Sequence, residues 1–291
     1  MYEGGLMYKN AYSIKPVIEL LKPFVRRFMV VNHQSSINEI IHPKPTGYSY
    51  LNWIVDGVWQ LKSGEFCSMK TPIFFAGQIK DEDIVVTHTG SFKHIATEFT
   101  ALGFYQLTGI KGIDCLNKPR SPQHFSKALD LQFNQLLNQS LHLSTAKGLE
   151  HYQRNLEASL LRMVDNQHTV PDYLIKGVKK IEEVDGLITI KEMCKDLDTS
   201  QRHFNRQFTE IVGLSPKYFS RVLQMNKALQ ALLSNDRDYL SQIANETGYY
   251  DESHFIRVIQ HFFNNSPSQF LNSRQETLFS FLGKSRTLPK K

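Results

Sequence analysis

The chain has 291 residues, of which 41% are hydrophobic and 21% are charged. This length is typical of about two domains, and the share of apolar residues excludes a chain that is disordered throughout. The net charge of +6 permits a polyanionic partner, but residues 1–170 and 171–291 each carry a net +3, so charge alone locates no nucleic-acid-binding domain.

The three cysteines, Cys67, Cys115 and Cys194, are odd in number and far apart in the sequence. We therefore expect neither a disulfide framework nor a cysteine-rich zinc site. The longest apolar stretch, Val17–Val31, is interrupted by three cationic side chains, and the first residues show no signal-peptide core. These features predict a cytoplasmic protein with no membrane partner.

Residues 1–120 have the pattern of a β-rich domain, because short aromatic and β-branched runs alternate with Gly, Pro and Asp. The Asp56-Gly57 pair between two apolar runs predicts a two-residue hairpin turn within Leu51–Leu61. Regularly spaced short strands are typical of a sandwich or a small β-barrel. A helix is also predicted at Pro16–Phe24, and the other predicted strands are Ile37–Ile41, Ile73–Ala76, Asp83–Thr87 and Phe92–Phe99.

From Ser121 onward the spacing of apolar residues becomes helical. One helix is expected to begin at Ser121-Pro122, and a second is expected over Thr145–Val164. The second helix carries an apolar face that either forms a dimer contact or covers the barrel: Leu149, Tyr152, Leu156, Leu160 and Leu161. A polar stretch ending in Pro171 predicts a domain boundary between Asn166 and Asp172, and the chain from there to about Ser273 is predicted to be helical.

The C-terminal part contains an internal repeat. His203-Phe204-Asn205-Arg206 recurs 51 residues later as His254-Phe255-Ile256-Arg257. Ser215-Pro216 and Phe219 recur at the same offset, as Ser266-Pro267 and Phe270. Because these identities lie in register in two separated clusters, they predict two copies of one structural unit.

Each copy has the layout of a helix-turn-helix. A short helix comes first, at Ile190–Leu197 and at Leu240–Thr247, with a small residue where the next helix crosses. Ser200 and Asp251 are expected to cap the second helix of each copy, and Gly248 supplies a positive φ in the second turn. One long helix, Pro216–Leu233, is predicted to join the copies.

The second helix of each copy has one buried and one outward face. Phe204, Phe208 and Ile211 form the buried stripe in copy one, and Phe255, Ile259 and Phe262 form it in copy two. Arg, Asn and Gln bond the edges of bases in the major groove, and apolar groups contact the thymine methyl. The outward residues predicted to bind DNA are Gln201, Arg202, Asn205, Arg206, Glu252, Ser253, His254, Ile256 and Arg257.

Residues 188–272 resemble the double helix-turn-helix domain of AraC/XylS-type transcription regulators, most closely over Ile243–Arg257 and Ser266–Phe270. Gln224 stands where that family often has arginine. The sequence pattern and this resemblance together predict an α+β protein with three parts: a cupin-like β-barrel sensor or dimerisation domain with helices at 1–165, an all-α DNA-binding domain at 172–275, and a basic tail at 276–291. It implies double-stranded DNA and RNA polymerase as partners, and leaves a small-molecule effector and a homodimer open.

The alternative function is a cupin-type metalloenzyme with a helical accessory domain. His88, His94 and Glu98 lie on predicted strands, but they do not form a His-x-His pair and their spacing does not suit a metal site. No phosphate loop, nucleophile elbow or catalytic carboxylate pair is found. We therefore expect a protein that is not an enzyme and has no catalytic residue, metal or cofactor. The ligand-binding residues are unknown, and aromatic residues such as Trp53 and Trp59 are expected in the core.

Overall fold

The computed structural model describes residues 10–14, 18–33, 38–63, 66–67, 71–138, 146–234, 240–263 and 266. The chain divides into two compact units. Unit 1 comprises residues 1–43, 48–170 and 209–214, and unit 2 comprises residues 44–47, 171–208 and 215–291. The predicted basic tail at 276–291 lies outside the described residues.

Unit 1 is built on an antiparallel sheet, in which the described strands follow the order β1-β2-β7-β4-β5. Strand β3 pairs with β7 beside β2, and β6 pairs with β4. The strands are β1 (Asn10–Ile14), β2 (Val25–His33), β3 (Asn38–Ile41), β4 (Tyr50–Ser63), β5 (Phe66–Cys67), β6 (Ile73–Ala76) and β7 (Ile84–Phe99).

The sheet of unit 1 is open, so the predicted closed β-barrel is wrong for the part of the chain described above. No pairing joins β1 to β5, which lie at the two ends of the strand order. The predicted class is nevertheless confirmed, because a strand-rich N-terminal region is followed by a helical C-terminal region. The two long strands β4 and β7 pair along most of their length and organise the sheet.

The hairpin predicted at Asp56-Gly57 is wrong, because β4 continues through this pair as one strand. Both halves of β4 pair with the same neighbour, β7, rather than with each other. The register shifts between Ile54 and Val58, where Gly57 has a φ of +103° and its amide donates to the Asp56 side chain at 2.8 Å. Two adjacent register shifts, between Ile54 and Asp56 and between Asp56 and Val58, thus interrupt the pairing as β-bulges or similar irregularities. Likewise, the two strands predicted at Asp83–Thr87 and Phe92–Phe99 form the single strand β7.

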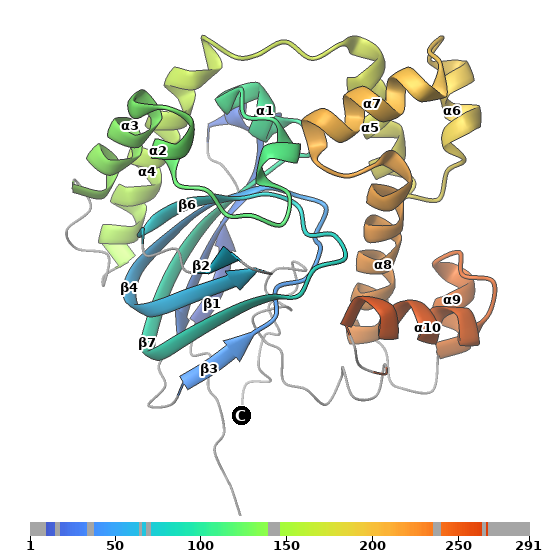
Figure 1. Ribbon diagram of the computed structural model, residues 1–291, viewed down its shortest axis with the longest axis horizontal. Helices are drawn as coiled ribbons and strands as arrows, with labels where there is room; N and C mark the ends of the chain where they lie inside the picture. The colour runs from blue at the N-terminus through green and yellow to red at the C-terminus, as the bar shows by residue number, and fades with distance from the viewer. Residues whose placement is uncertain are drawn as a thin grey trace, which may run out of the picture. The chain divides into compact units, whose positions relative to one another are not determined.

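The helices of unit 1 begin with a 3₁₀ turn, η1 (Glu19–Leu21), in place of the longer helix predicted at Pro16–Phe24. The chain enters β2 at Val25, since Val25 pairs with Phe99 across the sheet. Helices α2, α3 and α4 lie together along one side of the sheet (Figure 1). The remaining elements are α1 (Gly103–Thr108), the 3₁₀ helix η2 (Gly112–Cys115), α2 (Pro122–Phe125), α3 (Lys127–Asn138) and α4 (Ala146–Val164).

The apolar face of α4 covers the sheet of its own unit. Tyr152, Leu156 and Leu160 are buried in the main hydrophobic cluster, where the Tyr152 ring lies 4.8 Å from the Trp53 ring on β4. Burial raises the pKa of Tyr152. The sequence left open whether this face of α4 covers its own domain or forms a dimer contact. These three side chains cover the sheet of their own unit, so they are not available as a dimer contact.

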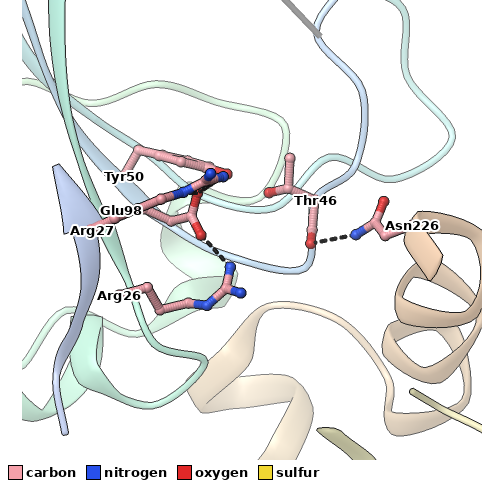
Figure 2. A network of polar contacts seen from close by, with 6 residues as sticks. All are labelled: Arg26, Arg27, Thr46, Tyr50, Glu98 and Asn226. Atoms are coloured by element: carbon pink, nitrogen blue, oxygen red, sulfur yellow. Dashed lines mark hydrogen bonds and ion pairs between the residues drawn. The ribbon is translucent and has the colours of Figure 1, made fainter. Parts of the chain in front are cut away.

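A buried carboxylate lies on the same sheet. Glu98 on β7 is fully buried and accepts hydrogen bonds from Arg26 and Arg27 on β2, at 2.7 Å from Nη2 of Arg27 (Figure 2). The Tyr50 hydroxyl donates to the same carboxylate at 3.3 Å. Two guanidinium groups thus neutralise a charge that would be costly to bury alone.

Unit 2 is helical in its described part (Figure 1). It also contains the short segment 44–47, where the Thr46 carbonyl accepts a hydrogen bond from Nδ2 of Asn226 at 2.9 Å (Figure 2). The helices are α5 (Asp172–Glu183), α6 (Ile190–Asp196), α7 (Gln201–Val212, of which residues 209–212 belong to unit 1), α8 (Pro216–Ser234), α9 (Leu240–Glu246) and α10 (Glu252–Phe263). In the described stretches of both units, no helix is long and apolar enough to cross a membrane.

Candidate nucleic-acid interface

The repeat seen in the sequence corresponds to two helix pairs of matching length. In copy one, α6 has 7 residues and α7 has 12. In copy two, α9 has 7 residues and α10 has 12. The first and last residues of α10 lie 51 positions after those of α7. The prediction of two copies of one helix pair is therefore confirmed.

The first helix of each copy ends in the same way. The amide of Thr199 donates to the Cys194 carbonyl at 3.1 Å, and the amide of Tyr249 donates to the Ala244 carbonyl at 2.8 Å. These bonds close the end of the first helix around a residue of positive φ. That residue is Gly248 in copy two, as predicted, with a φ of +75°. In copy one it is Asp198, with a φ of +48°, which was not predicted from the sequence.

Each second helix begins with the predicted cap. The amide of His203 donates to Oγ of Ser200 at 3.2 Å, and the amide of His254 donates to Oδ1 of Asp251 at 2.6 Å. Both bonds satisfy an amide in the first turn that has no partner within the helix. The caps fix where α7 and α10 start, and with it the rotation of each exposed face.

The inner faces of α7 and α10 are buried as expected. In α7, Phe204 and Phe208 are fully buried, and in α10 the same holds for Phe255 and Ile259. Cys194 on α6 and Ala244 on α9 are also buried, at matching positions of the repeat. Because these side chains hold one face inward, the opposite face of each helix must point outward.

The outward face of α7 carries all four residues predicted for copy one. Gln201, Arg202 and Arg206 are exposed, and Asn205 is half-buried. The Tyr173 hydroxyl on α5 lies 2.8 Å from Nε2 of His203, and Nη2 of Arg206 lies 3.5 Å from Nδ1 of the same ring. Burial raises the pKa of Tyr173, and the nearby Arg206 lowers it to a smaller extent. His203 therefore packs against α5.

The outward face of α10 carries the five residues predicted for copy two, with a different charge. Glu252, Ser253, His254 and Arg257 are exposed, and Ile256 is half-buried. Nε of Arg257 donates to the Ser253 carbonyl at 3.2 Å, which holds the guanidinium along the helix surface. The His254 ring lies 5.5 Å from the ring of Tyr249 in an edge-on contact. The two histidines of the repeat thus have different surroundings.

Helix α8 lies between the two copies within unit 2 (Figure 1). Its 19 residues correspond to a length of about 28 Å at 1.5 Å per residue. Nε2 of Gln224 donates to the Thr247 carbonyl at 2.9 Å, just after the end of α9. Gln224, which departs from the pattern of the similar family, therefore provides a hydrogen-bond donor to a backbone carbonyl at the end of a helix in the second copy.

The histidine and glutamate side chains of unit 1 that the metalloenzyme alternative would need as metal ligands do not form a metal site in the described residues. Glu98 is bound by Arg26 and Arg27, and Nε2 of His94 lies 2.9 Å from the Asn52 side-chain oxygen. Across the described ranges, no three His, Cys, Asp or Glu side chains are placed to hold a metal ion. Burial raises the pKa of Cys115 to about 12 and also raises that of Cys194, so both thiols are protonated and unreactive at neutral pH.

Unit 1 also has an open surface pocket of about 500 Å³ beside α2. Three of its lining residues are basic, Lys118, Arg120 and His124, and one is acidic, Asp114. Nε of Arg120 is buried and has no hydrogen-bond partner among the described residues. The remaining lining residues are apolar: Ile113, Leu116 and Phe125.

Comparison with known proteins bears on unit 2. A protein-family model described as a helix-turn-helix domain matches residues 193–273. An HTH-type transcriptional regulator of Haemophilus influenzae is 31% identical over 84 residues, which are 29% of this chain and 28% of that protein. The Msm operon regulatory protein of Streptococcus mutans is 26% identical over 98 residues, or 33% of this chain and 35% of that protein.

The chain therefore matches about a third of the length of these curated relatives. Among solved structures, ToxT from Vibrio cholerae is 12% identical, with a TM-score of 0.47 over 87% of this chain and 99% of that one. Taken together, the duplicated helix pairs of unit 2 and the family match over residues 193–273 identify this part of the chain as a helix-turn-helix domain.

Proposed function

We propose that the chain is a sequence-specific DNA-binding transcription regulator of the AraC type. The observation that supports this most directly is the repetition of one exposed polar face on α7 and α10, held by the same turn and cap. A helix presented in this way enters the major groove with its N-terminal half. The names of the curated relatives, both regulatory proteins, agree with this proposal.

In this proposal the two helices read successive major grooves on one side of the duplex. Arg202 and Arg206 bond guanine or phosphate, and Asn205 bonds adenine. In copy two, Arg257 and His254 take the polar contacts, Ile256 meets a thymine methyl, and Glu252 accepts from cytosine. Gln201 and Ser253, which begin the helices with Arg202 and Glu252, contribute phosphate or base-edge bonds.

The other assignments follow from this role. Residues 172–275 form the DNA-binding domain, and residues 1–165 form a sensor or dimerisation domain. RNA polymerase is the partner through which a DNA-bound regulator of this kind acts on transcription. The protein is not an enzyme and works in the cytoplasm, where its DNA target lies. A homodimer would have to use a surface other than the buried face of α4.

The test of the proposal is a pair of substitutions, Arg202→Ala and Arg206→Ala, measured on DNA recovered by in-vitro selection with the wild-type protein. Each variant is expected to lose about 1–3 kcal/mol of binding free energy and to relax the preference at one base step. Arg154→Ala is the matched control, because Arg154 is an exposed arginine on α4, in unit 1. Unchanged affinity and preference in both variants would refute the assignment of copy one.

Control by a small ligand is the second part of the proposal, and the open surface pocket beside α2 supports it. Its three basic residues and its apolar lining suit a small molecule that carries an acidic group and a short apolar body. Hexanoate is a suitable probe and neutral hexanol its control. Hexanoate is expected to raise the melting temperature of the wild type but not of Arg120→Ala. A shift of equal size with hexanol, or in Arg120→Ala, would exclude this pocket as the site.

A further inference from the structure

The second copy of the helix-turn-helix contains one residue more than the first. Up to Tyr249, the equivalent positions lie 50 residues apart, since Tyr249 makes the amide bond that Thr199 makes in copy one. From Asp251 onward the offset is 51, because Asp251 caps α10 as Ser200 caps α7. Tyr250 is the additional residue, and the turn before it and the cap after it are the same in both copies.

Tyr250 has no role in the packing of unit 2. Its neighbour Tyr249 is buried, with its ring 5.2 Å from that of Phe255, and burial raises its pKa. Tyr250, by contrast, is 90% exposed, more than any other large apolar or aromatic residue in the described ranges. The ring and the hydroxyl of Tyr250 therefore both face solvent next to a candidate binding surface, where tyrosine offers an apolar face and a hydrogen-bond donor.

The charge of the second copy indicates which group Tyr250 would meet on DNA. Copy one begins its exposed face with a cation, Arg202, and has no acidic residue among its four predicted contacts. Copy two begins with Asp251 and Glu252, and its first cation on the helix is Arg257, one turn later. If the start of α10 contacts a phosphate, the hydrogen-bond donor there is therefore a neutral group and not a basic side chain.

We propose that Tyr250 binds the DNA backbone beside the second recognition helix. Its hydroxyl donates a hydrogen bond to a phosphate oxygen, and its ring lies against the adjoining sugar. Tyrosine is among the side chains that make such backbone contacts, which set the register of a protein on DNA without reading sequence. The proposal rests on the function proposed above, and it names Tyr250 as a positioning residue for copy two.

The test compares Tyr250→Phe, Tyr250→Ala and the matched control Tyr249→Phe, each as the full chain, on selected and on unrelated DNA. Tyr250→Phe is expected to weaken binding about 3- to 10-fold on both DNAs, and Tyr250→Ala is expected to weaken it further. The control is expected to bind like the wild type. Because Tyr250 is exposed, all Tyr250 variants should keep the melting temperature of the wild type.

The salt dependence distinguishes a neutral backbone donor from a charged one. Loss of an arginine–phosphate contact lowers the slope of affinity against salt by about one, whereas loss of a neutral donor should leave that slope unchanged. Wild-type affinity in both Tyr250 variants would overturn the proposal, and a change of preference at a single base pair would replace it with a base contact. Failure of the wild type to bind any duplex would instead refute the proposed function.

Discussion

At the scale of single residues, the two copies show that identical sequence can serve different purposes. His203 and His254 occupy the same position of the repeat, yet His203 lies against Tyr173 on α5 while His254 is exposed beside Tyr249. The difference arises because α5 precedes the first copy and packs on it. Of the two, His254 is therefore the one left accessible to DNA.

The turn residues Asp198 and Gly248 allow a direct test of backbone strain. Gly248→Ala is expected to destabilise unit 2 by about 1–2 kcal/mol, because a side chain is strained at positive φ. The added Cβ would also meet Cδ2 of Leu187 at 2.3 Å. Asp198→Gly removes a side chain from the same conformation and is expected to be neutral or to stabilise by up to about 1 kcal/mol. Urea unfolding, followed by the circular dichroism of the helices, measures the change in the free energy of unfolding for both variants. If Asp198→Gly destabilised the protein as much as Gly248→Ala, the two turns would not be equivalent.

His94 makes the stability of unit 1 depend on pH. Desolvation by burial lowers its pKa to about 4, below the ordinary value of about 6.5. The unfolded chain therefore binds a proton more readily than the folded one as the pH falls. The contribution of neutral His94 to the free energy of unfolding is fully present above pH ~6.5. It is lost progressively as the pH falls towards ~4, by up to about 3 kcal/mol.

Tryptophan fluorescence isolates this effect, because the only two tryptophans of the chain, Trp53 and Trp59, both lie on β4 in unit 1. Urea unfolding of His94→Gln should show a smaller loss of stability between pH ~7.5 and ~4.5 than the wild type. His151→Gln, which changes an exposed histidine on α4, is the control and should keep the wild-type pH dependence. Parallel pH profiles for wild type and His94→Gln would exclude His94 as the cause.

At the scale of elements, the caps of α7 and α10 are predictable and testable. Asp251→Ala is expected to destabilise unit 2 by about 1 kcal/mol, since the His254 amide loses its acceptor. Asp251→Asn keeps an acceptor and should cost much less. The same unfolding measurement applies to both, and an equal loss in the two variants would show that charge at the start of the helix matters more than the cap.

The helical elements of unit 2 were predictable from sequence because their signals are local. Apolar spacing, Ser200, Asp251 and the repeat offset together define α6 to α10 within one or two residues at each bound. Asp198 could have been found by placing it opposite Gly248 in the repeat. The contact of Tyr173 with His203 could not, because it depends on how α5 packs.

The sheet of unit 1 was less predictable, since its form is set by long-range pairing. Asp56-Gly57 favours a hairpin locally, but β7 is long enough to pair with both halves of β4, and the pair becomes a bulge. The same pairing joins two predicted strands into β7 around Gly90, whose φ is +72°. The role of Glu98 was also unpredictable, because Arg26 and Arg27 lie about seventy residues away in the sequence.

At the scale of the whole molecule, the proposed function depends on the joint action of the two copies, and α8 determines their separation. A helix of about 28 Å plus the flanking turns suits successive major grooves, which recur about every 34 Å. One chain should therefore protect two patches of DNA about 10 base pairs apart on the same side of the duplex. Hydroxyl-radical footprinting on selected DNA measures this spacing directly.

Changing the DNA rather than the protein tests the same coupling without any risk to folding. Inserting five base pairs between the two patches rotates one of them by about half a turn around the duplex. A rigid unit 2 could then contact only one patch at a time. The affinity should therefore fall to that of a single patch. Inserting ten base pairs restores the side but lengthens the distance by about 34 Å, which α8 cannot span. Both insertions are therefore expected to weaken binding equally. Recovery with ten but not five would show instead that two separate chains occupy the patches, one copy each.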